Sequence, residues 1–150
     1  MARPLARARL APGAGTEFEF PLFPGTFFDG APIHIVTTAT LLHLAETSPE
    51  SDFSSPRFRP NFILDTSESL HGFVEDGWLG RRLQLGEVVL RVDRPTPRCV
   101  MTTLPQSGLR HDPGVLRTAV RSNGSNVGVY ATLVQSGRVF RGDAVRLLDD

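Results

Sequence analysis

The stretch Leu83-Gln84-Leu85-Gly86-Glu87-Val88-Val89-Leu90-Arg91-Val92 decides the fold class of this 150-residue chain. Apolar residues recur at every second position on both sides of the central Gly-Glu pair. This is the pattern of two antiparallel strands joined by a tight turn, with one face of each strand directed toward a core. The stretch therefore predicts a β-hairpin.

Short apolar runs of the same kind continue on both sides of the hairpin. The segment Glu17-Phe18-Glu19-Phe20 alternates and predicts one edge strand. Further strands are predicted at 33–36, 62–64, 99–104, 127–134 and 139–148, the last two as a hairpin across Ser136-Gly137. Many short strands and few helices favour a mainly β or α+β fold: a β-barrel of short strands with a few surrounding helices.

Capping signals predict two helices. Thr38 is a candidate N-cap for a short helix that ends at Ser48-Pro49. Asp112-Pro113 opens a second helix, which Asn123-Gly124 ends. The residues of the second helix expected to face the barrel are Val115, Leu116, Ala119 and Val120.

Composition bounds the class of protein. The length and the 40% apolar content suit one domain, predicted over 26–150, preceded by a loosely ordered, Arg-, Ala- and Pro-rich segment over 1–25. Acids and bases balance at 16 each, which argues against nucleic-acid and anionic-membrane partners. No apolar run approaches the ~20 residues of a membrane helix. A single cysteine fits a reducing cytoplasm, so a cytoplasmic protein is expected.

The cysteine, Cys99, is the first candidate for chemistry. It follows Pro95-Thr96-Pro97-Arg98, and the cation of Arg98 favours the thiolate, which is the nucleophilic and metal-binding form. A lone cysteine can be a buried small hydrophobe, a reactive thiol, or a thiolate bound to something soft. The residues alone leave these alternatives open.

Other polar clusters suit an anion. Arg57-Phe58-Arg59-Pro60-Asn61 carries two guanidinium groups and an amide, which suit a phosphate or a carboxylate, and equally a solvated loop with surface ion pairs. Thr37-Thr38 lies where a strand meets a helix start, as an anion site or as a plain capping pair. Glu75-Asp76 fits acid–base chemistry or a turn.

Six segments resemble, in order, those of MOSC domains, the domains similar to the C-terminal part of molybdenum cofactor sulfurases. The resemblance is greatest to the branch of the mitochondrial amidoxime-reducing components and their bacterial relatives. It covers about residues 27–148, and its most specific parts are Arg59-Pro60-Asn61 and Arg98-Cys99. The six segments are 57–61, 75–80, 85–88, 98–103, 127–130 and 142–143.

The resemblance implies a site for the molybdenum cofactor (molybdopterin). Cys99 matches the cysteine that ligates molybdenum, or that carries sulfur as a persulfide. Arg59 and Asn61 match residues that hold the pyranopterin, and Arg98, Thr37 and Thr38 match positions lining the same pocket. Relatives in this branch usually have a preceding β-domain with a Lys-Ser pair, whereas this sequence contains no lysine.

Three functions follow as expectations. The first is an oxidoreductase that reduces N-hydroxylated or N-oxide compounds, with a small-molecule substrate and a separate electron-donor protein. The second is a sulfur-transfer domain that uses a Cys99 persulfide. The third is a non-catalytic, truncated binding module.

Overall fold

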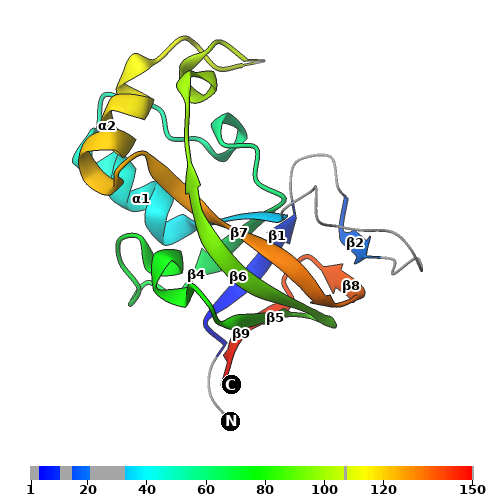
Figure 1. Ribbon diagram of the computed structural model, residues 1–150. Helices are drawn as coiled ribbons and strands as arrows, with labels where there is room; N and C mark the ends of the chain where they lie inside the picture. Colours follow the sequence, from blue (N-terminus) through cyan, green and yellow to red (C-terminus); the bar gives the residue numbers. More distant parts are fainter. Residues whose placement is uncertain (1–3, 11–14, 21–32, 107, 150) are drawn as a thin grey trace.

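Seven strands of the computed structural model close into a barrel in the order β1-β4-β3-β7-β6-β5-β9, and β2 and β8 form a separate two-stranded sheet (Figure 1). The structure describes residues 4–10, 15–20, 33–106 and 108–149. The strands are β1 Ala6–Leu10, β2 Glu17–Phe20, β3 Ile33–Thr37, β4 Phe62–Thr66, β5 Arg82–Leu85, β6 Val88–Pro97, β7 Asn126–Gln135, β8 Gly137–Phe140 and β9 Ala144–Leu148. The helices are α1 Thr38–Thr47 and α2 Pro113–Asn123, with short 3-10 turns η2 Ser55–Arg57, η3 Val74–Trp78 and η4 Val100–Thr103. The predicted mainly β barrel with a few helices is confirmed.

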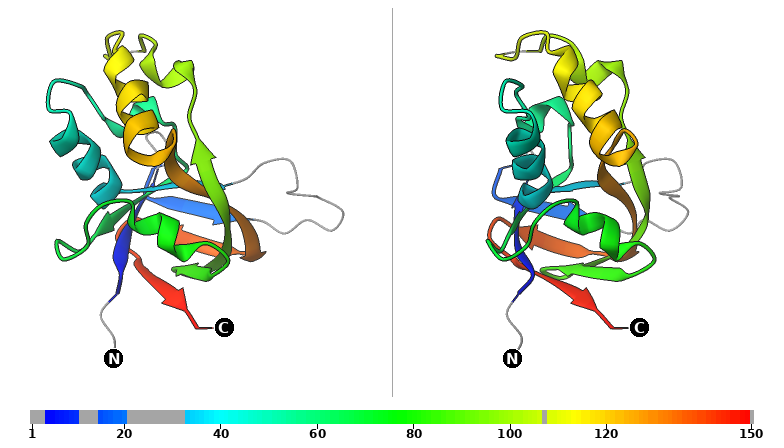
Figure 2. Two further views of the ribbon diagram at one scale, coloured as in Figure 1. Left: turned by 60° about the vertical axis from the view of Figure 1, so that its left-hand side comes forward. Right: turned by 90° about the vertical axis from the view of Figure 1, so that its left-hand side faces the viewer.

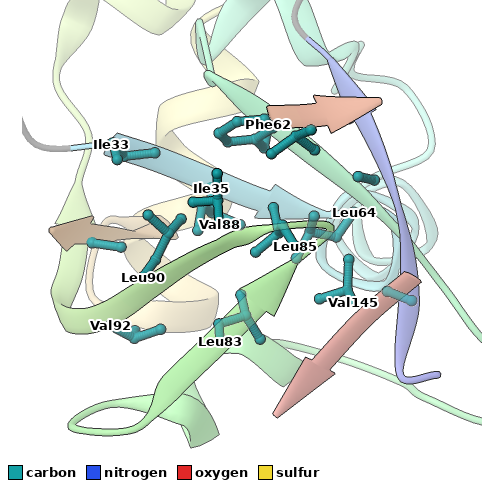
Figure 3. Packing of buried hydrophobic residues seen from close by; sticks show 14 of the residues in the cluster. Ile33, Ile35, Phe62, Leu64, Leu83, Leu85, Val88, Leu90, Val92 and Val145 are labelled. Carbon is teal, nitrogen blue, oxygen red and sulfur yellow. The ribbon is translucent and has the colours of Figure 1, made fainter. Parts of the chain in front are cut away.

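The hairpin that decides the fold forms as predicted. β5 and β6 pair antiparallel around Gly86, whose φ of +56° is a backbone conformation that glycine adopts readily. The alternating residues of both strands point into the barrel, where they pack with Ile35 and Leu64 from the opposite wall (Figure 3). Burial of these side chains supplies the main stabilisation of the barrel.

The segment expected to be loosely ordered contributes a barrel strand. β1 pairs antiparallel with both β4 and β9, so it joins the two ends of the curved sheet. Its buried residues are small and alternate with exposed arginines in the order Ala6, Arg7, Ala8, Arg9, Leu10. Because alanine is only weakly hydrophobic, the alternation of buried and exposed residues in β1 does not stand out in the sequence. The predicted edge strand at 17–20 is confirmed as β2, which pairs with β8.

A second apolar layer lies outside the barrel wall. β3 and β4 are parallel, and α1 belongs to the connection between them. α1 and α2 lie on the same side of the barrel, as the two views of Figure 2 show. This helical layer packs on outward-facing strand residues, and its buried members are Val36, Leu44, Phe53, Phe58, Val115, Ala119 and Val127.

Four expectations about elements were wrong. Residues 99–104 form η4 rather than a strand, since Thr102 and Thr103 donate side-chain hydrogen bonds back to carbonyl oxygens three residues earlier. Residues 139–148 do not form a hairpin with β7; they split into β8 and β9, which pair elsewhere. The N-cap of α1 is Thr37. Val120 of α2 is 52% exposed.

No helix in the described part of the chain is long and apolar enough to span a membrane.

Candidate functional site

The turn at 58–61 connects η2 to β4 and carries a backbone outlier. Arg59 has a φ of +49°, a left-handed conformation that few side-chain-bearing residues adopt. Its side chain is exposed, and Pro60 after it disfavours the ordinary helical conformation at Arg59. Asn61 fixes the end of the turn: its Oδ1 accepts from the N–H of His34 (2.8 Å), and its own N–H donates to the oxygen of His34 (2.9 Å). The turn is therefore bound directly to β3.

Arg98 approaches the same turn from β6. Its Nη2 donates to the carbonyl oxygen of Phe58 (2.8 Å), and its guanidinium carbon lies 5.6 Å from the centre of the Phe58 ring. The Nε of Arg98 is buried without a hydrogen-bond partner. Burial lowers the pKa of this guanidinium, and the nearby Tyr130 and Cys99 act in the opposite direction. An unsatisfied buried donor beside an exposed thiol suits an anionic ligand.

Cys99 is exposed and is the N-cap residue of η4. Its carbonyl oxygen accepts hydrogen bonds from the backbone N–H (3.1 Å) and the Oγ1 (2.9 Å) of Thr102. The backbone is thus fixed while the thiol faces outward. This exposure contradicts the interpretation of Cys99 as a buried small hydrophobe and leaves the reactive and ligand-binding interpretations.

Arg57 has a structural position instead. Its buried guanidinium donates to the carbonyl oxygens of Thr102 (3.3 Å) and Arg110 (2.8 Å), and lies 3.6 Å from the carboxylate of Asp52. The sequence interpretation of two arginines sharing one anion site is therefore wrong for Arg57. It ties η2 to η4 and so holds the segment that begins with Cys99.

A row of three side chains crosses the barrel wall below this turn. Arg94 of β6, Tyr130 of β7 and His34 of β3 are register partners on adjacent strands. The Arg94 guanidinium carbon lies 4.3 Å from the Tyr130 ring centre, and the Tyr130 and His34 rings are 5.6 Å apart. No motif in the sequence marks these three residues as part of the site. The alternating polar positions in β3 and β6 were the available signal.

His34 is buried and neutral. Its Nε2 lies 3.2 Å from the carbonyl oxygen of Val127, so the neutral ring fits as the donor. Burial, with the charge of Arg98 as a second cause, lowers the pKa of His34 to about 4.

Gly128 of β7 makes room for the His34 ring. A Cβ at this position would lie 2.5 Å from the oxygen of Ile35 and 2.6 Å from the Nε2 of His34, and its φ is +87°. Glycine inside a strand is a sequence signal of close approach. Here that approach belongs to the site.

Thr37 and Thr38 lie apart from this group, at the far end of β3. The Thr37 hydroxyl is buried, caps α1 through the N–H of Thr40 (3.1 Å), and donates to Glu75 (2.7 Å). Thr38 exchanges hydrogen bonds with Thr66 and lines a different hollow. Their polar groups already have protein partners.

Glu75 and Asp76 do not act as a pair. Glu75 is fully buried against α1, and burial raises the pKa of its carboxyl while the hydroxyls of Thr37 and Thr40 oppose the shift. Asp76 accepts from the side chain of Asn123 (2.8 Å). The turn interpretation of this dipeptide fits the structure better than acid–base chemistry.

The structure therefore places the turn that carries Arg59 and Asn61 against Arg98, the residue before Cys99, through the hydrogen bond to Phe58. None of Arg59, Arg94 and Arg98 forms an ion pair with a carboxylate of the described residues. The described residues contain no group of three or more His, Cys, Asp or Glu side chains that could hold a metal. A metal held through Cys99 would therefore have at most one further cysteine, histidine or carboxylate ligand from the described residues.

Comparison with known families gives one match. The family model of the MOSC domain matches residues 24–146. Among curated proteins, comparison by sequence finds no match.

Solved structures share the fold at low sequence identity. YiiM from Escherichia coli has a TM-score of 0.66 and 19% identity, over 97% of this chain and 70% of that one. YuaD from Bacillus subtilis has a TM-score of 0.63 and 15% identity, over 96% and 93%. YiiM from Geobacillus stearothermophilus has a TM-score of 0.56 and 20% identity over 78% of this chain, which spans only 54% of that protein.

Proposed function

The chain belongs to the MOSC domain family, and on that basis we propose that it binds the molybdenum cofactor at Cys99 and reduces N-hydroxylated or N-oxide compounds. The observation that carries the proposal is the buried, unpartnered Nε of Arg98 directly beside an exposed thiol. We also propose that the chain belongs to the branch of the amidoxime-reducing components within this family.

The residues present fit such a cofactor. A thiolate is a soft ligand, which suits a metal that carries dithiolene sulfur. Arg98 offers an unused N–H and Arg59 an exposed guanidinium, which suit the phosphate of a pterin tail. The Oδ1 of Asn61 accepts from the backbone N–H of His34. The amide nitrogen of the same side chain therefore remains a donor for the pterin ring.

The proposed roles of the chain follow from these positions. When bound, the cofactor supplies two-electron redox chemistry at the metal. Cys99 holds the metal at the surface, where a small substrate and a separate electron-donor protein both have access. The backbone N–H and carbonyl oxygen of His34 keep the turn at Asn61 in place, and its neutral ring adds no further positive charge beside Arg98. The substrate oxygen leaves as water, which requires two electrons and two protons from the donor and the solvent.

Sulfur transfer is a second candidate, favoured by the exposure of Cys99 beside a guanidinium. In that case the Cys99 thiolate attacks the outer sulfur of a donor persulfide, whose S–S bond breaks so that the donor leaves as a thiolate, and the Cys99 persulfide passes the same sulfur to an acceptor. The cofactor would then not be held stoichiometrically. The non-catalytic binding module has no observation in its favour.

The test is metal and sulfur analysis of Cys99→Ser, expressed in a host that makes the cofactor. Serine is close in size and Cys99 is exposed, so we expect the free energy of unfolding to change by less than about 0.5 kcal/mol. We expect molybdenum to be stoichiometric in the wild type and absent from Cys99→Ser, with turnover lost in parallel. A hydroxyl cannot replace a soft thiolate.

Met101→Leu is the matched control, because it removes a sulfur atom from η4 at a 49% exposed side chain and leaves Cys99 intact. It should keep full molybdenum content. Retention of molybdenum by Cys99→Ser contradicts the proposal. Cyanide-releasable sulfur on the wild type without molybdenum favours sulfur transfer.

A further inference from the structure

A groove lies between η4 and α2, immediately after Cys99 in the chain. It has a volume of about 450 Å³. In Figure 2, α2 (yellow to orange) runs beside the yellow-green segment that contains η4. Val100, the residue after Cys99, lines the groove, as do Leu116 and Val120 of α2. The groove is therefore an apolar hollow next to the proposed site.

α2 carries apolar side chains that the barrel does not cover. Val115 and Ala119 are buried in the helical layer, whereas Leu116 is half-buried and Val120 is 52% exposed. Val100 is 58% exposed on the facing side. Two exposed apolar side chains therefore face each other across one hollow and give it the apolar lining that small-molecule sites have.

The charges at the groove have one sign. Arg117 and Arg121 line it one helical turn apart, with His111 nearby, and none of its lining residues is acidic. Like charges at this spacing destabilise a helix in the absence of a counter-charge. Both arginines also border a neighbouring hollow that Glu50 and Asp112 line. Neither Arg117 nor Arg121 forms an ion pair within the described part of the chain. On the side of the groove, Arg121 therefore has no carboxylate beside it.

We propose that this groove binds a small organic anion with a flat apolar body, whose acidic group pairs with Arg121. The volume suits a ligand of one or two rings, since ligand pockets span roughly 300–1,000 Å³. A protein partner would need a much larger surface than these few residues provide. As the substrate of the Cys99 site, the ligand would be an N-hydroxylated or N-oxide compound that also carries an acidic group; that part rests on the proposed function.

Calorimetric titration of the full chain with 2-naphthoate and 2-naphthamide tests the proposal. The two probes share a shape and differ in charge. We expect naphthoate to bind more tightly than naphthamide. We expect Arg121→Gln to weaken the binding of naphthoate alone, by about two- to fivefold for loss of one exposed ion pair. Arg121→Lys should retain most of the affinity for naphthoate. In a parallel NMR titration, the backbone amide signals of Leu116 and Val120 should shift as naphthoate is added.

Arg141→Gln is the matched control, because it removes the same charge at the turn between β8 and β9, far from α2 (Figure 1). It should bind naphthoate like the wild type. Absence of naphthoate binding, equal affinity for the two probes, or an unchanged affinity in Arg121→Gln would overturn the proposal. Cys99→Ser should still bind naphthoate, so failure of the cofactor proposal and failure of this one give different results.

Discussion

At the scale of single residues, the site depends on groups whose ionisation the fold controls. His34 is kept neutral by burial and by the charge of Arg98, with a pKa of about 4 against 6.5 in the unfolded chain. The unfolded state therefore binds a proton between pH 6.5 and 4 that the folded state does not bind. Its contribution to stability is present above pH 6.5 and is lost as the pH falls through this window.

We expect His34→Gln to remove that pH dependence. The difference between the two pKa values corresponds to roughly 3 kcal/mol, so the wild type should lose about this much more stability than the variant between pH 7 and pH 4. Urea unfolding of both proteins across this range measures the difference. Parallel loss of stability in the two proteins would show that His34 is not held neutral.

The contribution of Glu75 to stability changes with pH in the opposite direction to that of His34. Burial raises the pKa of its carboxyl, so its contribution to stability is present below about pH 4.5, the unfolded value, and is lost as the pH rises through the folded pKa. Wild type and His34→Gln share Glu75, so comparing the two proteins at the same pH cancels the Glu75 contribution to stability.

Residue types in the sequence were enough to predict some of the candidate site residues. The backbone conformation determines which of these residues are neighbours in the structure. The turn at 58–61 and the segment of Arg98 are neighbours because Arg98 donates to the carbonyl oxygen of Phe58, a contact between distant segments that no local pattern shows. Sequence alone cannot show which of two neighbouring arginines is buried, so Arg57 was grouped with Arg59. Thr37 was grouped with the site because capping and anion binding use the same residue types.

At the scale of elements, η4 is held by one buried side chain. Replacing Arg57 by methionine leaves the carbonyl oxygens of Thr102 and Arg110 without their donor, in a buried setting. We expect Arg57→Met to lower the free energy of unfolding by about 2–4 kcal/mol. Arg110→Met, at an exposed side chain whose backbone oxygen is unchanged, should stay within about 0.5 kcal/mol of the wild type. Equal stability of the two variants in urea unfolding would refute this role.

Elements with strong local signals were predicted well. α2 begins at Asp112-Pro113 and ends at Gly124 as its capping residues indicate, and β5–β6 follow the alternation around Gly86. η4 was missed because side-chain hydrogen bonds to the backbone compete with strand pairing over a few residues. The partners of β8 and β9 were missed because pairing between distant strands has no local signature.

At the scale of the whole molecule, β1 closes the barrel, and matched substitutions on its two faces test this. Ala8 is 2% exposed and points inward, whereas Arg7 points outward. We expect Ala8→Gln to cost about 3 kcal/mol or more, because it puts a bulky polar group into a packed core. Arg7→Gln should cost less than about 0.5 kcal/mol. If thermal unfolding shows both variants to be equally stable, β1 is a loose segment rather than a wall of the barrel.

The pairing of β1 with β9 has a consequence for folding kinetics. Ala6 pairs with Val145, so the ring closes between residues near opposite ends of this sequence. Bringing such distant segments together costs loop-closure entropy, and contacts of this kind form slowly. Local hairpins such as β5–β6 can form before that step. Substitutions at the β1–β9 seam should therefore speed unfolding while leaving the refolding rate nearly unchanged.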